Sequence, residues 1–260
     1  MNPLDVTFAR LRQQGRRAFI PFLTVGDPDL AVTPQRAAAL VAAGADLLEL
    51  GFPYSDPIAD GPVIQSSYTR ALAQRLTLED IFRTAASIHA SHPATPLVAM
   101  TSFSLVWRRG PQWFLQRARE AGFSGLIVPD LPLEESAPLR GPAQTQGLHL
   151  IQLVTPTTPP ERAEQIVMAS AGFVYCVSVT GITGARAELP AALIERLGWL
   201  RGVTRLPLCV GFGVSTPQQV RQLRPHADGI IVGSALVRLL GDPEAFSRLA
   251  QELASAAHEV

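Results

Sequence analysis

Short apolar runs alternate with longer amphipathic stretches along the whole chain. A short apolar run between turn signals predicts a buried strand, and apolar residues spaced three and four apart predict a helix. Strands that alternate with helices in this way indicate parallel βα units. The predicted strands are Ala18–Thr24, Leu47–Leu50, Leu97–Thr101, Gly125–Val128, Leu148–Val154, Phe173–Val177, Leu208–Val210 and Gly229–Val232.

Helices are predicted around these strands, and several begin with proline, whose missing N–H does no harm in the first turn of a helix. The predicted helices are Pro34–Ala43, Pro62–Gln74, Leu78–Ala90, Pro111–Ala121, Leu133–Gln146, Pro160–Ala169, Pro190–Leu200, Pro217–Leu223, Ser234–Leu240 and Pro243–Ala257.

Three helix-to-strand junctions resemble one another: AAGADLLELG from Ala42, REAGFSGLIVPD from Arg119 and RPHADGIIVGS from Arg224. Each passes from a helix end through a small turn into an apolar strand, as stacked repeats do. Eight such units favour a closed barrel over an open sheet, and a chain of 260 residues fits one α/β barrel, which takes roughly 250. We therefore predict a single (βα)8 TIM barrel with extra helices, forming one domain over residues 1–260.

Charge and cysteine content narrow the class of protein. The 22 basic and 22 acidic side chains cancel, so the basic surface expected of a nucleic-acid-binding protein is missing. Cys176 and Cys209 lie in apolar strand-like runs, where reduced cysteine behaves as a small hydrophobic residue. The first residues do not resemble a secretory leader, and no uncharged apolar run has the length of a membrane helix. We expect a cytoplasmic protein that does not bind membranes.

The run ELGFPYSDPIADGPVIQ, from Glu49 to Gln65, places three carboxylates on a proline-rich loop that directly follows a predicted strand. Active sites of βα barrels lie at the carboxyl ends of the strands, so these acids are candidate catalytic groups. Leucines flank Glu49, and burial beside them would raise its pKa toward neutrality. A Glu49 that points to solvent is the alternative, and ordinary turn chemistry is the alternative for Asp56 and Asp60.

Two later segments are candidate phosphate sites. In VGFGVSTP, Gly211 and Gly213 would let backbone N–H groups approach an anion, and in IIVGSALV, Gly233 and Ser234 would begin a helix. Barrel enzymes often bind phosphate after the seventh and eighth strands. Glycine at such turns is commonly required only for tight packing, but the two segments together indicate a phosphorylated substrate.

Other chemistry finds less support in the sequence. The segment SVTGITGARAELP, from Ser178 to Pro190, is either a lid that closes over substrate or a plain surface loop. His89 and His92 have no acidic or thiol partner within a few residues, so we predict no metal site. GFGVS and VGSAL lack the pattern of a nucleophile elbow.

The acidic run, together with PFLTVGDPD from Pro21, GLIVPDLPLEES from Gly125 and LVTPTTPPER from Leu153, resembles the α subunit of tryptophan synthase. The resemblance implies a lyase that cleaves indole-3-glycerol phosphate to indole and glyceraldehyde 3-phosphate, with Glu49 and Asp60 as catalytic groups. It implies substrate contacts from Phe22, Met100, Leu126, Ile127, Leu153, Tyr175, Thr183 and Phe212. It implies phosphate contacts from Gly184, Gly213, Gly233 and Ser234.

The resemblance also implies a partner, a β subunit that carries pyridoxal phosphate and forms an α2β2 heterotetramer, while this chain needs no cofactor. We expect the loop Pro53–Pro62 to be exposed at the interface with that partner. The interface residues would be Pro53, Asp56, Pro57, Asp130 and Pro132.

One segment departs from the family, which usually has a tyrosine, one further residue and an asparagine after the third strand. This chain has Ser102, Phe103 and Ser104 there. Three other functions stay open: a free-standing indole-releasing lyase, another phosphosugar-processing barrel enzyme such as an isomerase, and a barrel that only activates a partner. An isomerase would want an acid or thiol at the end of the first strand, where this chain has Thr24.

Overall fold

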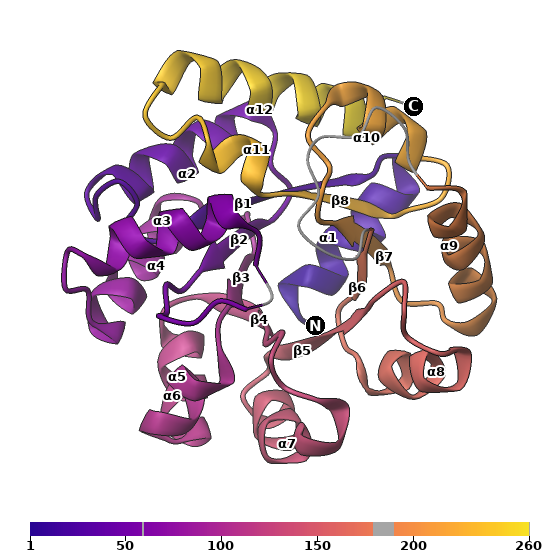
Figure 1. Cartoon of the computed structure of the whole chain (residues 1–260), viewed down its shortest axis with the longest axis horizontal. Helices are drawn as coiled ribbons and strands as arrows, with labels where there is room; N and C mark the ends of the chain where they lie inside the picture. The colour runs from indigo at the N-terminus through magenta and orange to yellow at the C-terminus, as the bar shows by residue number, and fades with distance from the viewer. Residues whose placement is uncertain (59, 179–189, 260) are drawn as a thin grey trace.

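The computed structural model describes residues 1–58, 60–178 and 190–259. Its eight parallel strands pair in sequence order, and the first pairs with the eighth, so the sheet closes into a barrel with helices around it (Figure 1). The predicted (βα)8 barrel is thereby confirmed. The strands are β1 Ala18–Thr24, β2 Leu48–Gly51, β3 Leu97–Met100, β4 Phe123–Ile127, β5 His149–Val154, β6 Val174–Val177, β7 Leu208–Gly211 and β8 Gly229–Val232.

The strands are almost entirely buried because side chains fill the barrel on one face and helices cover the other. The helices of the described residues are α1 Pro3–Gln13, α2 Val32–Ala43, α3 Pro62–Leu72, α4 Leu78–Ser91, α5 Phe103–Arg109, α6 Pro111–Glu120, η1 Leu133–Glu135 (a 3-10 turn), α7 Ala137–Thr145, α8 Pro160–Ala169, α9 Ala191–Val203, α10 Pro217–Leu223, α11 Ser234–Val237 and α12 Pro243–His258.

Several helix boundaries follow from local capping. Thr77 and Asp80 form a capping box at the start of α4, and Thr216 and Gln219 form another at the start of α10. Each box satisfies backbone N–H groups that the first turn of a helix leaves without partners. The threonine cap and the proline after it are visible in the sequence of α10, and its predicted bounds match the structure. The predicted bounds of α8, which begins with Pro160, match as well.

Three helical segments differ from the sequence prediction. α1 and α5 were not predicted, although Asn2 and Ser102 cap them by accepting hydrogen bonds from backbone N–H groups. The predicted helix Leu133–Gln146 is instead the 3-10 turn η1 followed by α7. Pro138 favours this break, because in the first turn of α7 its missing N–H does no harm, whereas in the interior of one longer helix its ring would crowd the preceding turn.

Helix α1 closes the amino end of the barrel. The Asn2 side chain donates hydrogen bonds to the carbonyls of Ser124 and Gly147, at 2.8 and 2.9 Å, near the starts of β4 and β5. The ring of Phe8 packs against Phe173, just before β6, with 5.8 Å between centroids. With this end filled, the opposite end of the strands is available for a functional site.

Candidate functional site

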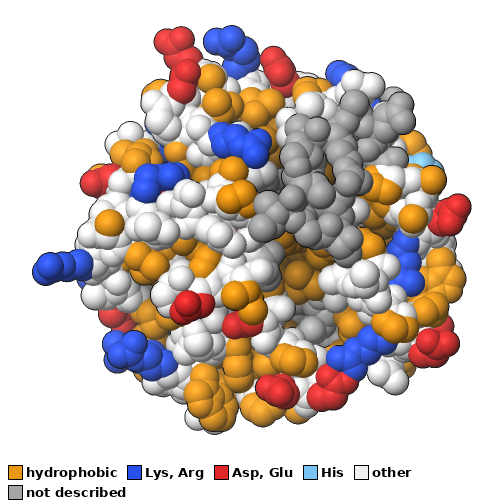
Figure 2. Space-filling model, viewed as in Figure 1, with side chains coloured by type: hydrophobic (Ala, Val, Ile, Leu, Met, Phe, Trp, Pro, Cys, Tyr) orange, Lys and Arg blue, Asp and Glu red, His pale blue; other side chains and the backbone are white. Residues whose placement is uncertain are grey.

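A cavity of about 640 Å³ opens at the carboxyl ends of the strands. In Figure 2, drawn from the same side as Figure 1, hydrophobic side chains lie in a hollow near the centre of this face. Residues from six of the strands, β1, β2, β3, β5, β6 and β8, meet there with residues of the loops. The predicted site residues that line the cavity are Phe22, Glu49, Asp60, Met100, Leu153, Tyr175, Phe212, Gly213, Gly233 and Ser234.

Glu49 lies in the short strand β2 and is only 1% exposed. Burial and, to a smaller extent, the negative charge of Asp60 together raise the pKa of its carboxyl to about 8. Its Oε2 atom has no hydrogen-bond partner among the described residues, although it is buried. Glu49 is therefore a protonated acid near neutral pH, with an oxygen free to contact a ligand in the cavity.

Asp60 is 5% exposed and lies just before helix α3, whose cap is Gly61. Burial raises the pKa of Asp60 to about 6, and a hydrogen bond from the Tyr54 hydroxyl opposes the rise. Asp60 is therefore mostly an anion at neutral pH. When the environments of two carboxyls push their pKa values apart, the one with the higher pKa can act as an acid while the other, as an anion, stabilises positive charge.

Helix α3 holds the backbone of Asp60 in place. The Gln65 side chain donates hydrogen bonds to the carbonyl of Asp60 at 2.8 Å and to that of Pro57 at 3.3 Å. Gln65, in the first turn of α3, thus binds the backbone of the loop that carries the Asp60 carboxylate.

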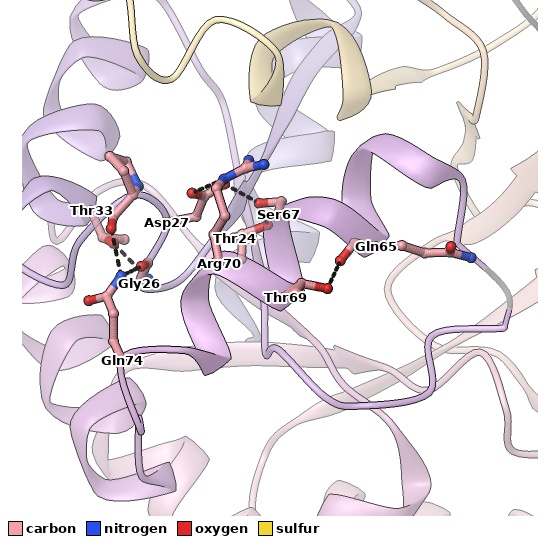
Figure 3. Close-up of polar contacts among 10 residues, drawn as sticks. Thr24, Gly26, Asp27, Thr33, Gln65, Ser67, Thr69, Arg70 and Gln74 are labelled. Atoms are coloured by element: carbon pink, nitrogen blue, oxygen red, sulfur yellow. Dashed lines mark hydrogen bonds and ion pairs between the residues drawn. The ribbon is translucent and has the colours of Figure 1, made fainter.

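Helix α3 is itself fixed to the segment after β1 by an ion pair between the half-exposed Arg70 and the buried Asp27, which Figure 3 shows. Arg70 donates two hydrogen bonds to the Asp27 carboxylate, at 2.8 and 2.6 Å, and Ser67 also donates to it. The Ser67 hydroxyl also lies 2.7 Å from Thr24 Oγ1. A bidentate arginine on a buried carboxylate restricts direction as well as distance, so this contact orients α3 and the loop before it.

Aromatic rings form the apolar wall of the cavity. The rings of Tyr175 and Phe212 meet edge to face with centroids 5.8 Å apart. Glycines make the room for them: a Cβ at Gly51 would collide with the Phe22 ring, and one at Gly211 would collide with the Tyr175 hydroxyl. Such a wall suits a flat, largely apolar ligand group.

The phosphate candidates lie together at another part of the wall, where Arg238 joins them. Gly213 has a φ of 81°, so its own backbone favours glycine whether or not a ligand binds. At Gly233 a Cβ would make only ordinary contacts, the nearest 3.5 Å from Phe22. Because packing does not demand glycine there, Gly233 leaves space that a ligand can use.

Two of the predicted substrate contacts are not at the cavity wall. Leu126 and Ile127 are fully buried in β4, and the cavity is instead lined by Val128, Pro129 and Leu131 of the following segment. The expectation that Leu126 and Ile127 line the pocket is not supported by this geometry, because their side chains pack within the barrel wall. Thr183 and Gly184 lie outside the described residues.

The predicted interface residues differ in exposure. Asp56, Asp130 and Pro132 are exposed and Pro57 is half-buried, but Pro53 is buried. The expectation that the loop Pro53–Pro62 is exposed is therefore wrong at Pro53 and also at Asp60, which is buried. Pro53 directly follows Phe52, which is packed in the core.

The segment that departs from the family pattern contacts this same surface. Ser102 donates a hydrogen bond of 2.7 Å to the Asp130 carboxylate, and the backbone N–H of Phe103 donates another of 2.8 Å. Ser104 lies 2.8 Å from Ser102, hydroxyl to hydroxyl. The two serines are therefore turned to Asp130 and not to the buried carboxyls.

Sequence reasoning missed three residues of the site: Tyr54, Gln65 and Arg238. The first two lie inside the acidic run itself, but only the folded loop shows what they contact. Arg238 follows Ser234 by four residues on a predicted helix, a spacing that places both on one face. It is the one basic side chain among the described residues that line the cavity.

Within the described ranges, no group of three or more His, Cys, Asp and Glu side chains is arranged to hold a metal ion. Over the same part of the chain, none of the helices combines the length and apolarity that crossing a membrane requires.

The closed barrel and its cavity define an α/β-barrel enzyme with paired carboxyl groups at the carboxyl ends of the strands. A model of the tryptophan synthase alpha chain family matches residues 8–259. The tryptophan synthase alpha chain of Rhodopirellula baltica is 49% identical over 244 residues, covering 93% of this chain and 88% of the relative. That of Microcystis aeruginosa is 48% identical, with 93% and 92% covered.

Solved structures agree with these relatives. Tryptophan synthase subunit alpha from Legionella pneumophila superposes with a TM-score of 0.91 at 35% identity, covering 99% of this chain and 98% of the other. A chain in the structure of Mycobacterium tuberculosis tryptophan synthase gives 0.93 at 36% identity, with the same coverage. The chain belongs to the tryptophan synthase alpha chain family, a family of lyases in tryptophan biosynthesis.

Proposed function

We propose that this chain cleaves indole-3-glycerol phosphate by a reversed aldol reaction, with Glu49 as the proton-transfer residue and Asp60 as the stabiliser of positive charge. The observation that carries the proposal is the pair of buried carboxyls beside one apolar cavity, with pKa values near 8 and 6. One carboxyl is thus poised to donate a proton at the pH at which the other is an anion.

The reaction balances with these two groups alone. Protonated Glu49 gives its proton to indole C3, and positive charge develops at the indole nitrogen, where the Asp60 anion stabilises it. The Glu49 carboxylate then takes the proton of the adjacent glycerol hydroxyl. The carbon–carbon bond breaks, its electron pair restores the aromatic ring, and the hydroxyl carbon leaves as an aldehyde. Glu49 ends protonated, ready for another cycle.

The cavity suits this substrate in size and character. Its volume of about 640 Å³ lies within the usual range for small-molecule sites, roughly 300 to 1,000 Å³. The indole would lie against Phe22, Tyr175 and Phe212. The phosphate would lie at Gly213, Gly233 and Ser234, with Gly184 completing the site and Thr183 orienting the carboxyls. Arg238 supports this placement, since it adds positive charge beside those residues.

An alanine at Gly233 should weaken phosphate binding without unfolding the protein. A methyl group there meets only ordinary contacts within the protein, but it would obstruct a phosphate approaching the backbone. We expect Gly233→Ala to bind glycerol phosphate ~10-fold more weakly or worse by calorimetry, since losing one charge-assisted hydrogen bond exceeds 1.4 kcal/mol. Gly241→Ala is the matched control, because Gly241 faces open space. Equal affinities in both variants and the wild type would rule out this phosphate site.

We also propose a β-subunit partner that carries pyridoxal phosphate and docks on the surface formed by Asp56, Pro57, Asp130 and Pro132. These residues are at least partly exposed, and their chain neighbours Ile58, Pro129 and Leu131 line the cavity. Pro53, being buried, would support the loop from beneath and not touch the partner. A reduced, cytoplasmic setting is proposed as well, because the buried Cys176 and Cys209 are both free.

Docking of the partner should raise the lyase rate, because the loop at the interface also carries Asp60. Coupling of this kind is typically worth about 1 to 3 kcal/mol, or roughly 5- to 150-fold. We expect the low end of that range, since Ser102 and Ser104 are smaller than the side chains usual in the family. The measurement titrates a β subunit into the assay with wild type, Asp56→Ala and, as a control, Glu244→Ala on α12. Complex formation without stimulation of the wild type would contradict the coupling.

The rival barrel reaction, sugar isomerisation, is less well supported by the geometry. Thr24 ends β1 but is buried, and its hydroxyl lies 2.7 Å from Ser67 and outside the cavity wall. It therefore offers no acid or base to a sugar carbon. A free-standing lyase differs from the proposal only in needing no partner, and the titration above distinguishes the two.

A further inference from the structure

Tyr54 is the one described residue whose side chain donates a hydrogen bond to the Asp60 carboxylate. Its hydroxyl lies 3.3 Å from Asp60 Oδ2. The ring is half-buried and packs on the fully buried ring of Tyr68, with centroids 5.3 Å apart, so the hydroxyl is held in place by more than its own hydrogen bond. The segment after β3 supplies no second donor, because Ser102 is bonded to Asp130 instead.

From this geometry we infer that Tyr54 is a positioning residue that keeps Asp60 ionised and directed into the cavity while Glu49 remains protonated. The inference rests on the proposed function, in which Glu49 transfers the proton and Asp60 stabilises the positive charge. A hydroxyl that donates to a carboxylate stabilises its charged form.

The hydrogen bond from Tyr54 matters because the surroundings of Asp60 oppose its ionisation. The titratable and charged groups that face Asp60 or Tyr54, or that line the cavity with Asp60, are Glu49 from β2, Tyr68 from α3, Tyr175 from β6, Asp130 after β4 and Arg238 directly after α11. Arg238 is the positively charged member of this set, but its side chain is exposed to water, which screens its charge. Burial opposes ionisation of Asp60, and Tyr54 provides the specific contact that favours it.

Tyr54 can serve as a donor throughout the working pH range. Burial and then the charge of Asp60 raise the pKa of its phenol above the ordinary value, so the hydroxyl keeps its proton. An ionised Asp60 in turn raises the pKa of Glu49. The Tyr54 hydroxyl thus acts directly on Asp60 by its hydrogen bond, and indirectly on Glu49 through the negative charge of Asp60.

The test replaces Tyr54 with Phe, which keeps the ring packed on Tyr68 and removes only the hydroxyl. Tyr68→Phe is the matched control, because the Tyr68 hydroxyl belongs to the same buried cluster but has no hydrogen-bond partner among the described residues. The first readout is the pH titration of the Asp60 carboxyl carbon by ¹³C NMR, assigned by its loss in Asp60→Asn. We expect the midpoint to rise by about half to one pH unit in Tyr54→Phe and to stay in place in Tyr68→Phe.

The second readout is the pH profile of kcat. Because the anion of Asp60 is the active form, activity falls as pH drops through its pKa, and a higher pKa moves this acid limb upward. We expect Tyr54→Phe to lose about 2- to 5-fold in kcat at pH 6 and little at pH 8. An unchanged NMR midpoint, or an equal rise in Tyr68→Phe, would overturn the role of Tyr54. Absence of indole release by the wild type would refute the proposed reaction instead, and the NMR midpoints would still decide on Tyr54.

Discussion

Replacement of Glu49 by glutamine is expected to lower kcat about 100-fold or more, because the amide fills the same space but can neither give a proton to indole C3 nor take one from the glycerol hydroxyl. Binding of the substrate should change little, since Glu49 is neutral at pH 7 with its pKa near 8. Single-turnover kinetics separate the two effects. Near-normal turnover in Glu49→Gln would show that another residue moves the proton.

The same substitution should stabilise the fold at alkaline pH. The unfolded Glu49 ionises near its ordinary pKa of 4.5, whereas the folded one stays protonated up to about 8. The folded state therefore binds the extra proton in this window, and the free energy of unfolding falls as pH rises through it. Glutamine does not ionise, so in Glu49→Gln this fall in the free energy of unfolding is absent. Thermal unfolding of wild type and Glu49→Gln at pH 5 and pH 8 should show the larger gain at pH 8.

Replacement of Asp60 by asparagine is the other substitution with a large expected effect. Asparagine can still accept a hydrogen bond from Tyr54, but it carries no charge to offset the cation at the indole nitrogen. Removing one preorganised group that faces developing charge typically costs roughly 100- to 1,000-fold, and we expect kcat to fall by about 100-fold with KM little changed.

A second effect makes the Asp60 prediction specific. Without the negative charge of Asp60, the pKa of Glu49 should drop, although burial, the larger cause, keeps it above the ordinary value. The alkaline limb of the residual activity should therefore move to lower pH. A profile of Asp60→Asn whose alkaline limb coincides with that of the wild type would mean that the two carboxyls do not interact.

The fold was largely predictable because its signals are local. β1 is a seven-residue apolar run and α8 begins with proline, so the predicted bounds of both match the structure. The break at Pro138 was also readable, but the apolar periodicity of Leu133–Gln146 masked it. Helix α5 was not predicted because it is only seven residues long, too short to show a clear apolar periodicity.

The site was predictable only in part, because its geometry depends on tertiary contacts. The sequence indicates that Glu49 follows an apolar segment, but not that one of its oxygens is buried without a partner. The family resemblance implies ligand contacts from Leu126 and Ile127, and only the folded barrel shows that Val128 reaches the cavity instead. The hydrogen bond from Tyr54 to Asp60 spans six residues of a loop whose path no periodicity reveals.

The most direct test of the central claim is to incubate the purified chain alone with indole-3-glycerol phosphate and to quantify both products over time. We expect indole and glyceraldehyde 3-phosphate in equal amounts, at a rate proportional to the concentration of the chain and nearly abolished in Glu49→Gln. Consumption of the substrate without indole, or no consumption at any substrate concentration, would contradict the assignment of this barrel as an indole-releasing lyase.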